Sequence, residues 1–413
     1  MINGSASRIS RNITRSLTGV LVLSMALLSG SANAEVAKPE DNASVAVMRY
    51  ESGSAASGWL PFDYYDGRRI FVSATVNGKQ TQVMLDSGAS STVLDNRFAI
   101  ALGLKPHGKF KGEGSGGSAD YSTIHGLTIT LGKLTITPHE AVALDISPVE
   151  KQLGHPLPVI LGGDAFSKAV VDIDFATHRI AFRDPASFEA PAKATSLPVT
   201  TYTENRVISV MVEQQPAKLL FDLGNGGALS LFPRFWDRPA FKEGRKLAST
   251  ISGGWGGMGI EKVTMVSSVT LGGSTFLEVP TTLDGTRSAD ARSGQLDGNL
   301  GMGLLSRFHL FVDFAHNRVL FEDPDTSRPF PANHIGLELR PGKAGYTILA
   351  VVPASPAALA GFQAGQIVVA VEDERSRSPI ALSDRWTASP VGRMLRIRLA
   401  DGRIKEVIAA RYF

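Results

Sequence analysis

Short apolar runs that end in Gly, Asn or Asp turns dominate the chain from about residue 61 to residue 326. In residues 71–76, β-branched and aromatic residues lead directly into Asn77-Gly78, which is typical of a strand entering a hairpin. This pattern of short apolar runs and turns extends over residues 61–190 and again over residues 197–326. A short segment of small residues links the two regions. The pattern predicts two all-β lobes, named here lobe 1 (residues 61–190) and lobe 2 (residues 197–326).

The pattern changes beyond residue 331. Residues 346–352 and 367–371 are predicted strands, and residues 356–359 between them form a short predicted helix that Gly361 ends. This mixture predicts a small α+β domain over residues 332–413.

One motif occurs twice, namely an apolar strand that runs into an Asp-x-Gly turn. The first turn is Asp86-Ser87-Gly88, and the second, Asp222-Leu223-Gly224, follows 136 residues later. Further landmarks keep nearly the same offset: residues 72–78 with 208–214, 159–163 with 298–302, and 174–180 with 313–319. The agreement indicates an internal duplication in which each lobe carries one aspartate on a tight turn.

The N-terminal residues 1–34 have the parts of a secretory signal peptide: a basic start, an apolar stretch and an Ala-x-Ala site at 32–34. The apolar stretch is shorter than the roughly 20 residues of a membrane-spanning helix. Cleavage would leave a periplasmic or secreted protein with no stable membrane span, and a retained N-terminal anchor is the alternative. Residues 35–60 are small and polar, so we expect a flexible N-terminal lead-in.

Composition excludes several function classes. The 413-residue chain has no cysteine, which rules out disulfides, thiolate metal sites and a cysteine nucleophile, and its eight histidines show no metal-ligand spacing. The formal charge of +3 falls to about zero once the three arginines of residues 1–34 are removed. With no basic run and no phosphate-binding motif, we expect no nucleic acid, no metal and no cofactor.

The two aspartate turns point to a specific chemistry. Two carboxylates held close together cannot both ionise at modest cost, so one keeps its proton while the other stays charged. Such a pair can hold a water molecule between a base and an acid, which suits hydrolysis of a peptide bond. Gly88 and Gly224 permit the tight turns that bring backbone N–H groups near the carboxylates.

The duplicated lobe resembles the pepsin/retropepsin-type aspartic peptidases over residues 60 to 326. Asp86-Ser87-Gly88-Ala89 is similar to the retropepsin form of the catalytic motif, and Leu161-Gly162 and Leu300-Gly301 resemble the segment that packs behind each catalytic loop. The resemblance implies that Asp86 and Asp222 are catalytic. It assigns support of the catalytic loops to Ser87, Gly88, Leu223, Gly224 and Asn225.

Leu223 departs from the family pattern, in which Thr or Ser follows each aspartate and bonds across to the opposite loop. Half of this reciprocal contact is therefore missing. Asn225 and Asn299 are candidate polar replacements.

The family covers its cleft with a flexible hairpin, and two Gly-rich segments stand in suitable places. Residues 112–117 contain Gly114 and Gly116 and are followed by Tyr121, while residues 253–259 contain Trp255. Both segments are candidate flaps over an extended polypeptide substrate. The alternative is that they are ordinary turns.

The C-terminal domain resembles a bacterial PDZ domain in its motifs at 353–357 and 360–365, although Gln366 replaces the usual Asp. In PDZ domains the loop corresponding to Gly336, Leu337, Glu338 and Leu339 captures a peptide C-terminus. The alternative is a PDZ fold that serves only packing or partner docking.

Together these features predict a mainly β protein with two duplicated pepsin/retropepsin-like β lobes followed by a small PDZ-like α+β domain, similar to bacterial aspartyl proteases with a C-terminal PDZ domain. The expected function is an aspartic endopeptidase. Because of Leu223, a catalytically silent peptide-binding protein of the same fold is the alternative. A purely structural envelope protein is a third possibility, which explains neither aspartate turn.

Overall fold

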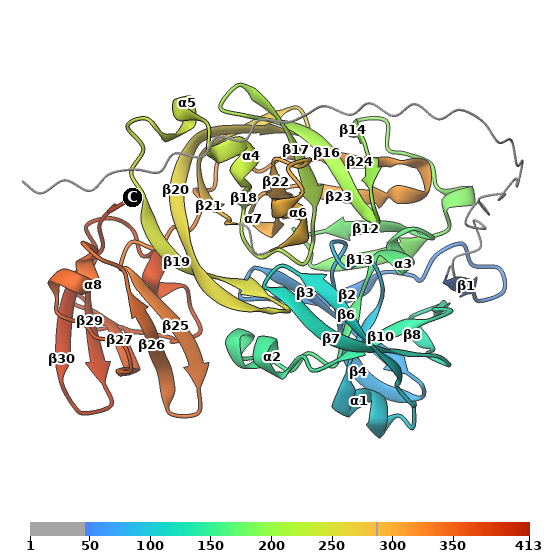
Figure 1. The fold of residues 1–413 in the computed structure, drawn as a ribbon, viewed down its shortest axis with the longest axis horizontal. Helices are drawn as coiled ribbons and strands as arrows, with labels where there is room; N and C mark the ends of the chain where they lie inside the picture. The colour runs from blue at the N-terminus through green and yellow to red at the C-terminus, as the bar shows by residue number, and fades with distance from the viewer. Residues whose placement is uncertain (1–45, 286–287) are drawn as a thin grey trace, which may run out of the picture. The chain divides into compact units, whose positions relative to one another are not determined.

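The computed structural model describes residues 46–285 and 288–413 (Figure 1). The expected signal peptide at 1–34 and residues 35–45 of the expected lead-in lie outside the described residues. Strands hold 47% of the residues and helices 12%, so the mainly β prediction is confirmed. Within the described part of the chain, no helix is long and apolar enough to cross a membrane.

Lobe 1 is a set of short strands joined mostly by tight turns. Its central hairpin, β3 and β4, turns at Asn77 and Gly78, which both have positive φ values, of 45° and 81°. The Asn-Gly prediction of this hairpin is therefore correct. The strands are β2 (Leu60–Tyr65), β3 (Arg69–Val76), β4 (Lys79–Leu85), β5 (Val93–Asp95), β6 (His107–Gly114), β7 (Gly117–Ile124), β8 (Ile129–Leu131), β9 (Leu134–Thr137), β10 (Ala141–Leu144), β11 (Val159–Leu161), β12 (Val170–Asp174) and β13 (Arg179–Arg183).

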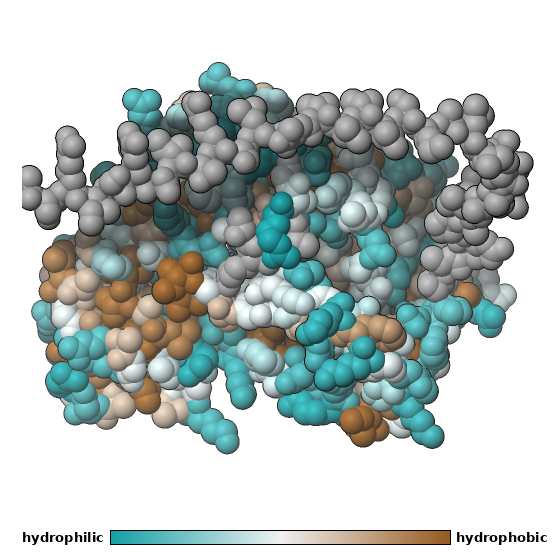
Figure 2. Space-filling view, in the orientation of Figure 1, coloured by the Kyte–Doolittle hydropathy of each residue, from teal (hydrophilic) through white to brown (hydrophobic). Residues whose placement is uncertain are grey.

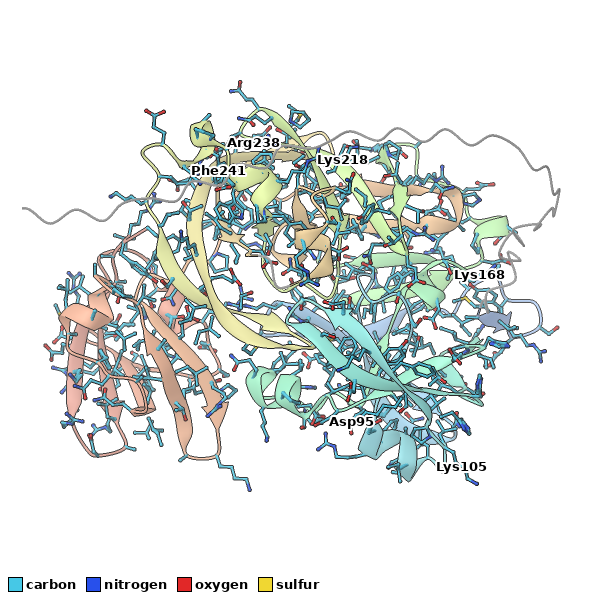
Figure 3. The ribbon with its side chains drawn as sticks, viewed as in Figure 1. Asp95, Lys105, Lys168, Lys218, Arg238 and Phe241 are labelled. Carbon is cyan, nitrogen blue, oxygen red and sulfur yellow. The ribbon has the colours of Figure 1, made fainter. Side chains whose placement is uncertain are left out.

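Three short helices complete lobe 1: α1 (Asn96–Ala101), α2 (Ser147–Leu153) and α3 (Gly163–Phe166). Asp95, labelled in Figure 3, is the N-cap of α1, where its carboxylate accepts a hydrogen bond from the Arg97 N–H at 3.0 Å. The same carboxylate accepts from the Ile146 N–H at 3.3 Å, so it ties α1 to the segment that leads into α2.

Lobe 2 repeats this plan. Its central hairpin, β16 and β17, lies 136 residues after β3 and β4, but Glu213 and Gln214 occupy the positive-φ turn positions in place of Asn-Gly. The strands are β14 (Thr195–Pro198), β15 (Thr200–Tyr202), β16 (Asn205–Val212), β17 (Gln215–Phe221), β18 (Leu229–Leu231), β19 (Ala248–Gly254), β20 (Gly257–Leu271), β21 (Ser274–Leu283), β22 (Gly298–Leu300), β23 (His309–Asp313) and β24 (Arg318–Glu322), with helices α4 (Pro233–Trp236), α5 (Pro239–Lys242), α6 (Ala289–Arg292) and α7 (Met302–Leu305).

Strands from both lobes form one continuous sheet. In the order β14-β24-β23-β12-β13-β2, strand β12 of lobe 1 pairs antiparallel with β23 of lobe 2, and Val171 lies opposite Val312. One hydrophobic core runs through both lobes. The two lobes are therefore fixed to each other by backbone hydrogen bonds as well as by apolar packing.

The expected flexible lead-in is wrong for its described part. Strand β1 (Val47–Tyr50) pairs antiparallel with β9. Farther along, Ser57 is buried, and its N–H donates to the Phe182 carbonyl at 2.8 Å. The Gly- and Ser-rich composition suggested mobility, but pairing with distant strands satisfies the backbone of this segment.

The C-terminal domain has its own sheet, with strands β25 (Leu337–Gly342), β26 (Gly345–Val351), β27 (Ile367–Asp373), β28 (Pro379–Ile380), β29 (Met394–Leu399) and β30 (Ile404–Ile408), and its own apolar core. The predicted short helix is α8 (Pro356–Leu359). Ser355 caps it, and Gly361 follows with a φ of 71°.

Figure 2 shows apolar side chains over this domain, whose exposed large apolar residues are Leu359, Val391, Ile404 and Ile408.

Candidate active site

Each aspartate of the duplicated motif follows a central strand that is backed by a parallel neighbour. The Asp86 N–H donates to the Leu161 carbonyl on β11 at 3.0 Å, and the Asp222 N–H donates to the Leu300 carbonyl on β22 at the same distance. Leu161-Gly162 and Leu300-Gly301, which we predicted to pack behind the turns, lie at the ends of these two parallel strands, β11 and β22. Each aspartate therefore extends from a rigid strand end.

The turns hold the carboxylates with backbone N–H groups. Asp86 Oδ1 accepts hydrogen bonds from Gly88 N at 2.9 Å and from Ala89 N at 3.0 Å. Asp222 Oδ1 accepts from Gly224 N at 2.7 Å and from Asn225 N at 3.0 Å. These paired donors fix the orientation of both carboxyl groups and favour their charged forms.

The two carboxyl groups lie against each other's turns. A Cβ atom added to Gly88 would be 2.6 Å from Cγ of Asp222, and a Cβ added to Gly224 would overlap the carboxyl group of Asp86. Neither glycine has a positive φ, so the backbone conformation does not require glycine. Glycine is required because any side chain would clash with the carboxyl group of the opposite aspartate. The structure thus brings together the four residues that the duplicated motif supplies.

A single hydroxyl joins the two loops. Ser87 Oγ donates to the Phe221 carbonyl at 3.0 Å and accepts from the Leu223 N–H at 3.0 Å. The side chain of Leu223 is fully buried in the shared core and has no polar atom that could bond back to the first loop. The contact between the loops is therefore one-sided.

The two asparagines do not replace the missing half of this contact. Asn299 Nδ2 donates to Asp222 Oδ2 at 2.7 Å, and Asn225 Nδ2 donates to Asn299 Oδ1 at 2.8 Å. Both asparagines belong to lobe 2, so they support the aspartate of their own lobe and do not bridge to lobe 1. Ile160, which occupies the position of Asn299 in lobe 1, gives Asp86 no equivalent donor.

The electrostatic environment makes Asp86 harder to ionise. Burial, reinforced by the charge of Asp222, raises the pKa of Asp86 to about 7, although Arg69 opposes this shift. Sequence reasoning did not identify Arg69. The 136-residue offset makes Arg69 at the start of β3 equivalent to Asn205 at the start of β16, and this difference between the lobes is the signal that could have identified it.

The two Gly-rich segments predicted as flaps are the tips of two hairpins, β6–β7 and β19–β20, and the tips contact each other. The Gly116 N–H donates to the Trp255 carbonyl at 2.9 Å, and Trp255 also lies edge-to-face with Tyr121 at a ring distance of 6.3 Å. A Cβ on Gly114 would lie 2.5 Å from that same carbonyl oxygen. The glycines thus allow two backbones to approach closely, and the indole of Trp255 packs between the hairpins.

The predicted peptide-binding loop of the C-terminal domain does not join this site. Gly336 precedes β25, and its N–H donates to Asn333 Oδ1 at 2.8 Å, while Leu337 is buried in the domain core. Glu338 Oε1 accepts a hydrogen bond from Thr250 Oγ1 on β19 at 3.1 Å, and burial raises its pKa to about 7. Leu339 packs partly buried against the same core.

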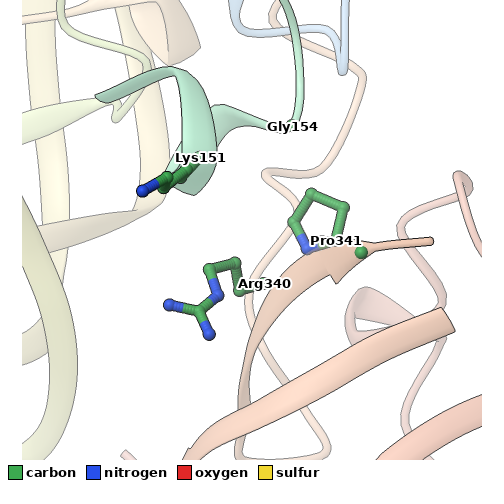
Figure 4. A pocket seen from close by; sticks show the side chains of 5 residues that line it. Lys151, Gly154, Arg340 and Pro341 are labelled. Atoms are coloured by element: carbon green, nitrogen blue, oxygen red, sulfur yellow. The ribbon is translucent and has the colours of Figure 1, made fainter. Parts of the chain in front are cut away.

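A separate open cavity of about 630 Å³ lies between α2 and β25 (Figure 4). Lys151, Gly154, Arg340, Pro341 and Gly342 line it, so it contains neither aspartate. In residues 46–285 and 288–413, no group of three or more His, Cys, Asp or Glu side chains is placed to hold a metal ion.

Comparison with known proteins agrees with this geometry. Residues 72–165, which include Asp86 and the first hairpin, match the family described as aspartyl protease, and residues 347–397 match the PDZ domain family. No curated protein matches the chain. The chain therefore combines an aspartyl protease domain with a C-terminal PDZ domain, the architecture that the sequence motifs predicted.

Proposed function

We propose that the protein is an aspartic endopeptidase that hydrolyses an extended polypeptide, with Asp86 and Asp222 as its catalytic pair. The observation that carries this proposal is the mutual placement of the two carboxyl groups, each against the glycine of the other's turn. The hydroxyl of Ser87 holds the two loops together. An ordinary pair of turns would not need glycines at both points of approach.

The environment supports a different role for each aspartate. Asp222 receives an additional hydrogen bond from Asn299, which stabilises its charged form, whereas the pKa of Asp86 is raised. Asp222 is therefore the base that removes a proton from water, and Asp86 is the acid that donates to the carbonyl oxygen of the peptide bond. When the resulting diol collapses, one of its hydroxyls returns a proton to Asp86, Asp222 gives its proton to the leaving nitrogen, and the C–N bond breaks. The pair then holds a single proton again.

In the proposed peptidase, the two hairpins would close over the substrate. Their tips meet through Gly116 and Trp255 and would have to separate before a polypeptide could enter.

For the location, the signal-peptide pattern at 1–34 supports a periplasmic or secreted protein. The PDZ domain family is the support for a peptide C-terminus as a second ligand.

The test is cleavage of a random peptide library from acid to neutral pH by the mature chain and by the Asp86→Asn and Asp222→Asn variants. Both variants should lose turnover by at least about 1,000-fold, because each removes one half of the acid–base pair. The matched control is Asp401→Asn, an exposed aspartate of the PDZ domain, which should cleave like the parent. Turnover that survives in either catalytic variant would overturn the proposal.

A catalytically silent peptide-binding protein is the second candidate, and the one-sided contact at Leu223 favours it. The discriminating variant is Leu223→Thr, which returns a hydroxyl to this position. If the parent is inactive and this variant cleaves peptides, the binding function is correct for the natural chain. Thermal unfolding of the variant should accompany the assay, because a polar group would enter a fully buried site.

A further inference from the structure

Arg69 brings a positive charge from lobe 1 to the catalytic loop of lobe 2. A Cβ atom added to Gly226 would overlap its guanidinium, so the side chain lies directly against this glycine. Burial and the charge of Arg68 lower the pKa of Arg69 from its ordinary value, and the charges of Asp222 and Asp86 oppose this shift. Arg69 is thus a cation within electrostatic reach of both carboxyl groups.

The guanidinium has unused binding capacity. Its side chain is partly exposed, and within the described residues its one hydrogen bond runs from Nη1 to the Arg68 carbonyl at 3.1 Å. No carboxylate in the described part of the chain forms an ion pair with it. A guanidinium has five N–H donors in a planar fork that matches a carboxylate, so the described residues leave most of this capacity unmet.

The equivalent position in lobe 2 has the opposite character. Asn205 begins β16 as Arg69 begins β3, and its amide lies 3.5 Å from both carboxylate oxygens of Asp290. The charge of Asp222 also acts on Asp290, so this acidic residue belongs to the same site. One half of a pseudo-symmetric site therefore presents a cation, and the other half presents an amide and a carboxylate.

We propose that Arg69 is a specificity residue that binds a carboxylate of the substrate in the half of the site formed by β3 and Gly226. An acidic residue of the polypeptide would be accepted on this side of the scissile bond and disfavoured on the side of Asp290. This inference rests on the proposed peptidase function, and it names the class of peptide that the site selects. An acidic side chain and a free C-terminal carboxylate are the two sources of this chemistry.

The experiment uses matched peptides in which Glu or Gln is placed at each position around one cleavage site. One set is acetylated and amidated, so that its only carboxylate is the side chain, and a second set has a free C-terminus. In the parent, kcat/KM should be about tenfold higher for Glu than for Gln at one position on one side of the bond. The set that shows the preference identifies the source of the carboxylate.

Three substitutions then test the residue. Arg69→Gln should bring the Glu-to-Gln ratio to about one, and Arg69→Glu should bring it below one. Gly226→Asp, which supplies a carboxylate beside the guanidinium, should also remove the preference by occupying Arg69. The matched control is Arg68→Gln, since Arg68 is exposed and paired with Asp66 at 3.3 Å, and its ratio should equal that of the parent.

The outcomes separate the two proposals. A parent that cleaves peptides with equal rates for Glu and Gln at every position overturns the role of Arg69 and leaves the peptidase intact. A pH profile that shifts in Arg69→Gln, with an unchanged Glu-to-Gln ratio, shows that Arg69 acts only on the catalytic pair and also overturns the proposal. If the parent cleaves nothing, the peptidase function fails, and calorimetric binding of the same peptides decides whether Arg69 still selects Glu.

Discussion

The two lobes share one backbone plan but differ in the polar groups around their aspartates. Lobe 1 supplies the bridging hydroxyl of Ser87 and the cation of Arg69, whereas lobe 2 has Leu223 and Asn205 at these positions and adds the amide of Asn299. The turn geometry depends on backbone hydrogen bonds to each carboxylate and on the close approach of each carboxyl group to the opposite glycine, so both lobes must keep the Asp-x-Gly turn. The side chains around the turns are free to diverge, and their divergence can give each aspartate a separate role.

Among the changes that compare the two lobes, the largest effect is expected from removing the hydroxyl of Ser87, which joins the two catalytic loops. Ser87→Ala leaves the Phe221 carbonyl and the Leu223 N–H without their partner in a buried place. We expect a loss of about 2 to 4 kcal/mol in the free energy of unfolding, because two buried polar groups lose their hydrogen bonds. Turnover should fall by about 100-fold through misplacement of the loops. Urea unfolding and peptide cleavage measure the two effects, and an unchanged stability would show that the bridge is unimportant.

The pH dependence tests whether the two aspartates really differ. The pKa of Asp86 is raised to about 7, so above this pH both carboxyl groups are charged and no proton remains for the carbonyl oxygen. Turnover should fall about tenfold per pH unit above the folded-state pKa. Because the unfolded chain releases this proton at lower pH, the free energy of unfolding should also decrease as pH rises toward 7. A profile that stays flat from acid to alkaline pH contradicts the assignment.

The amide of Asn299 can be removed by copying the residue of the other lobe. Asn299→Ile removes the 2.7 Å hydrogen bond to Asp222 and makes the position match Ile160. We expect turnover to fall about tenfold, since a hydrogen bond to a charged group contributes about 1.5 to 3 kcal/mol. The reciprocal variant Ile160→Asn is the control, and equal losses in both would mean that packing and not the amide matters.

A smaller effect is expected where the hairpins meet. Trp255→Ala removes the indole that packs against Gly112, Gly114 and Tyr121, but it keeps the backbone hydrogen bond to Gly116. KM should rise several-fold with a smaller change in kcat, because the hairpins would close less firmly on the substrate. Phe110→Ala, on the other hairpin and exposed, is the comparison variant. A fall in kcat alone would place Trp255 in the chemical step.

The smallest effect concerns the contact between lobe 2 and the PDZ domain. Glu338, which faces Thr250 on β19, has its pKa raised to about 7 by burial, so ionising it opposes the folded state. This part of the stability is present below the unfolded-state pKa and is lost as pH rises toward 7. Glu338→Gln should flatten the pH dependence of the melting temperature slightly. Glu374→Gln, elsewhere in the domain, should leave that dependence unchanged.

Local patterns predicted the β lobes, the hairpin turn at Asn77-Gly78, the helix at 356–359 and the Gly-rich hairpin tips, since each depends on residues adjacent in the chain. They failed at residues 47–58, where composition suggested mobility and pairing with distant strands imposed order. They also made Asn225 and Asn299 candidates for the missing contact between the loops, which these residues do not form.

The sequence by itself determined the duplication, because apolar strands and Asp-x-Gly turns reappear at a nearly constant offset and each copy needs its glycine to form the turn. It also determined which two aspartates to examine. Only the tertiary structure decided which polar groups surround each one. Ser87 reaches a loop 134 residues away, and Arg69 lies beside Gly226, because the interlobe sheet and the common core bring distant segments together. Contacts of this kind depend on side-chain reach across a packed interface, which no local pattern encodes.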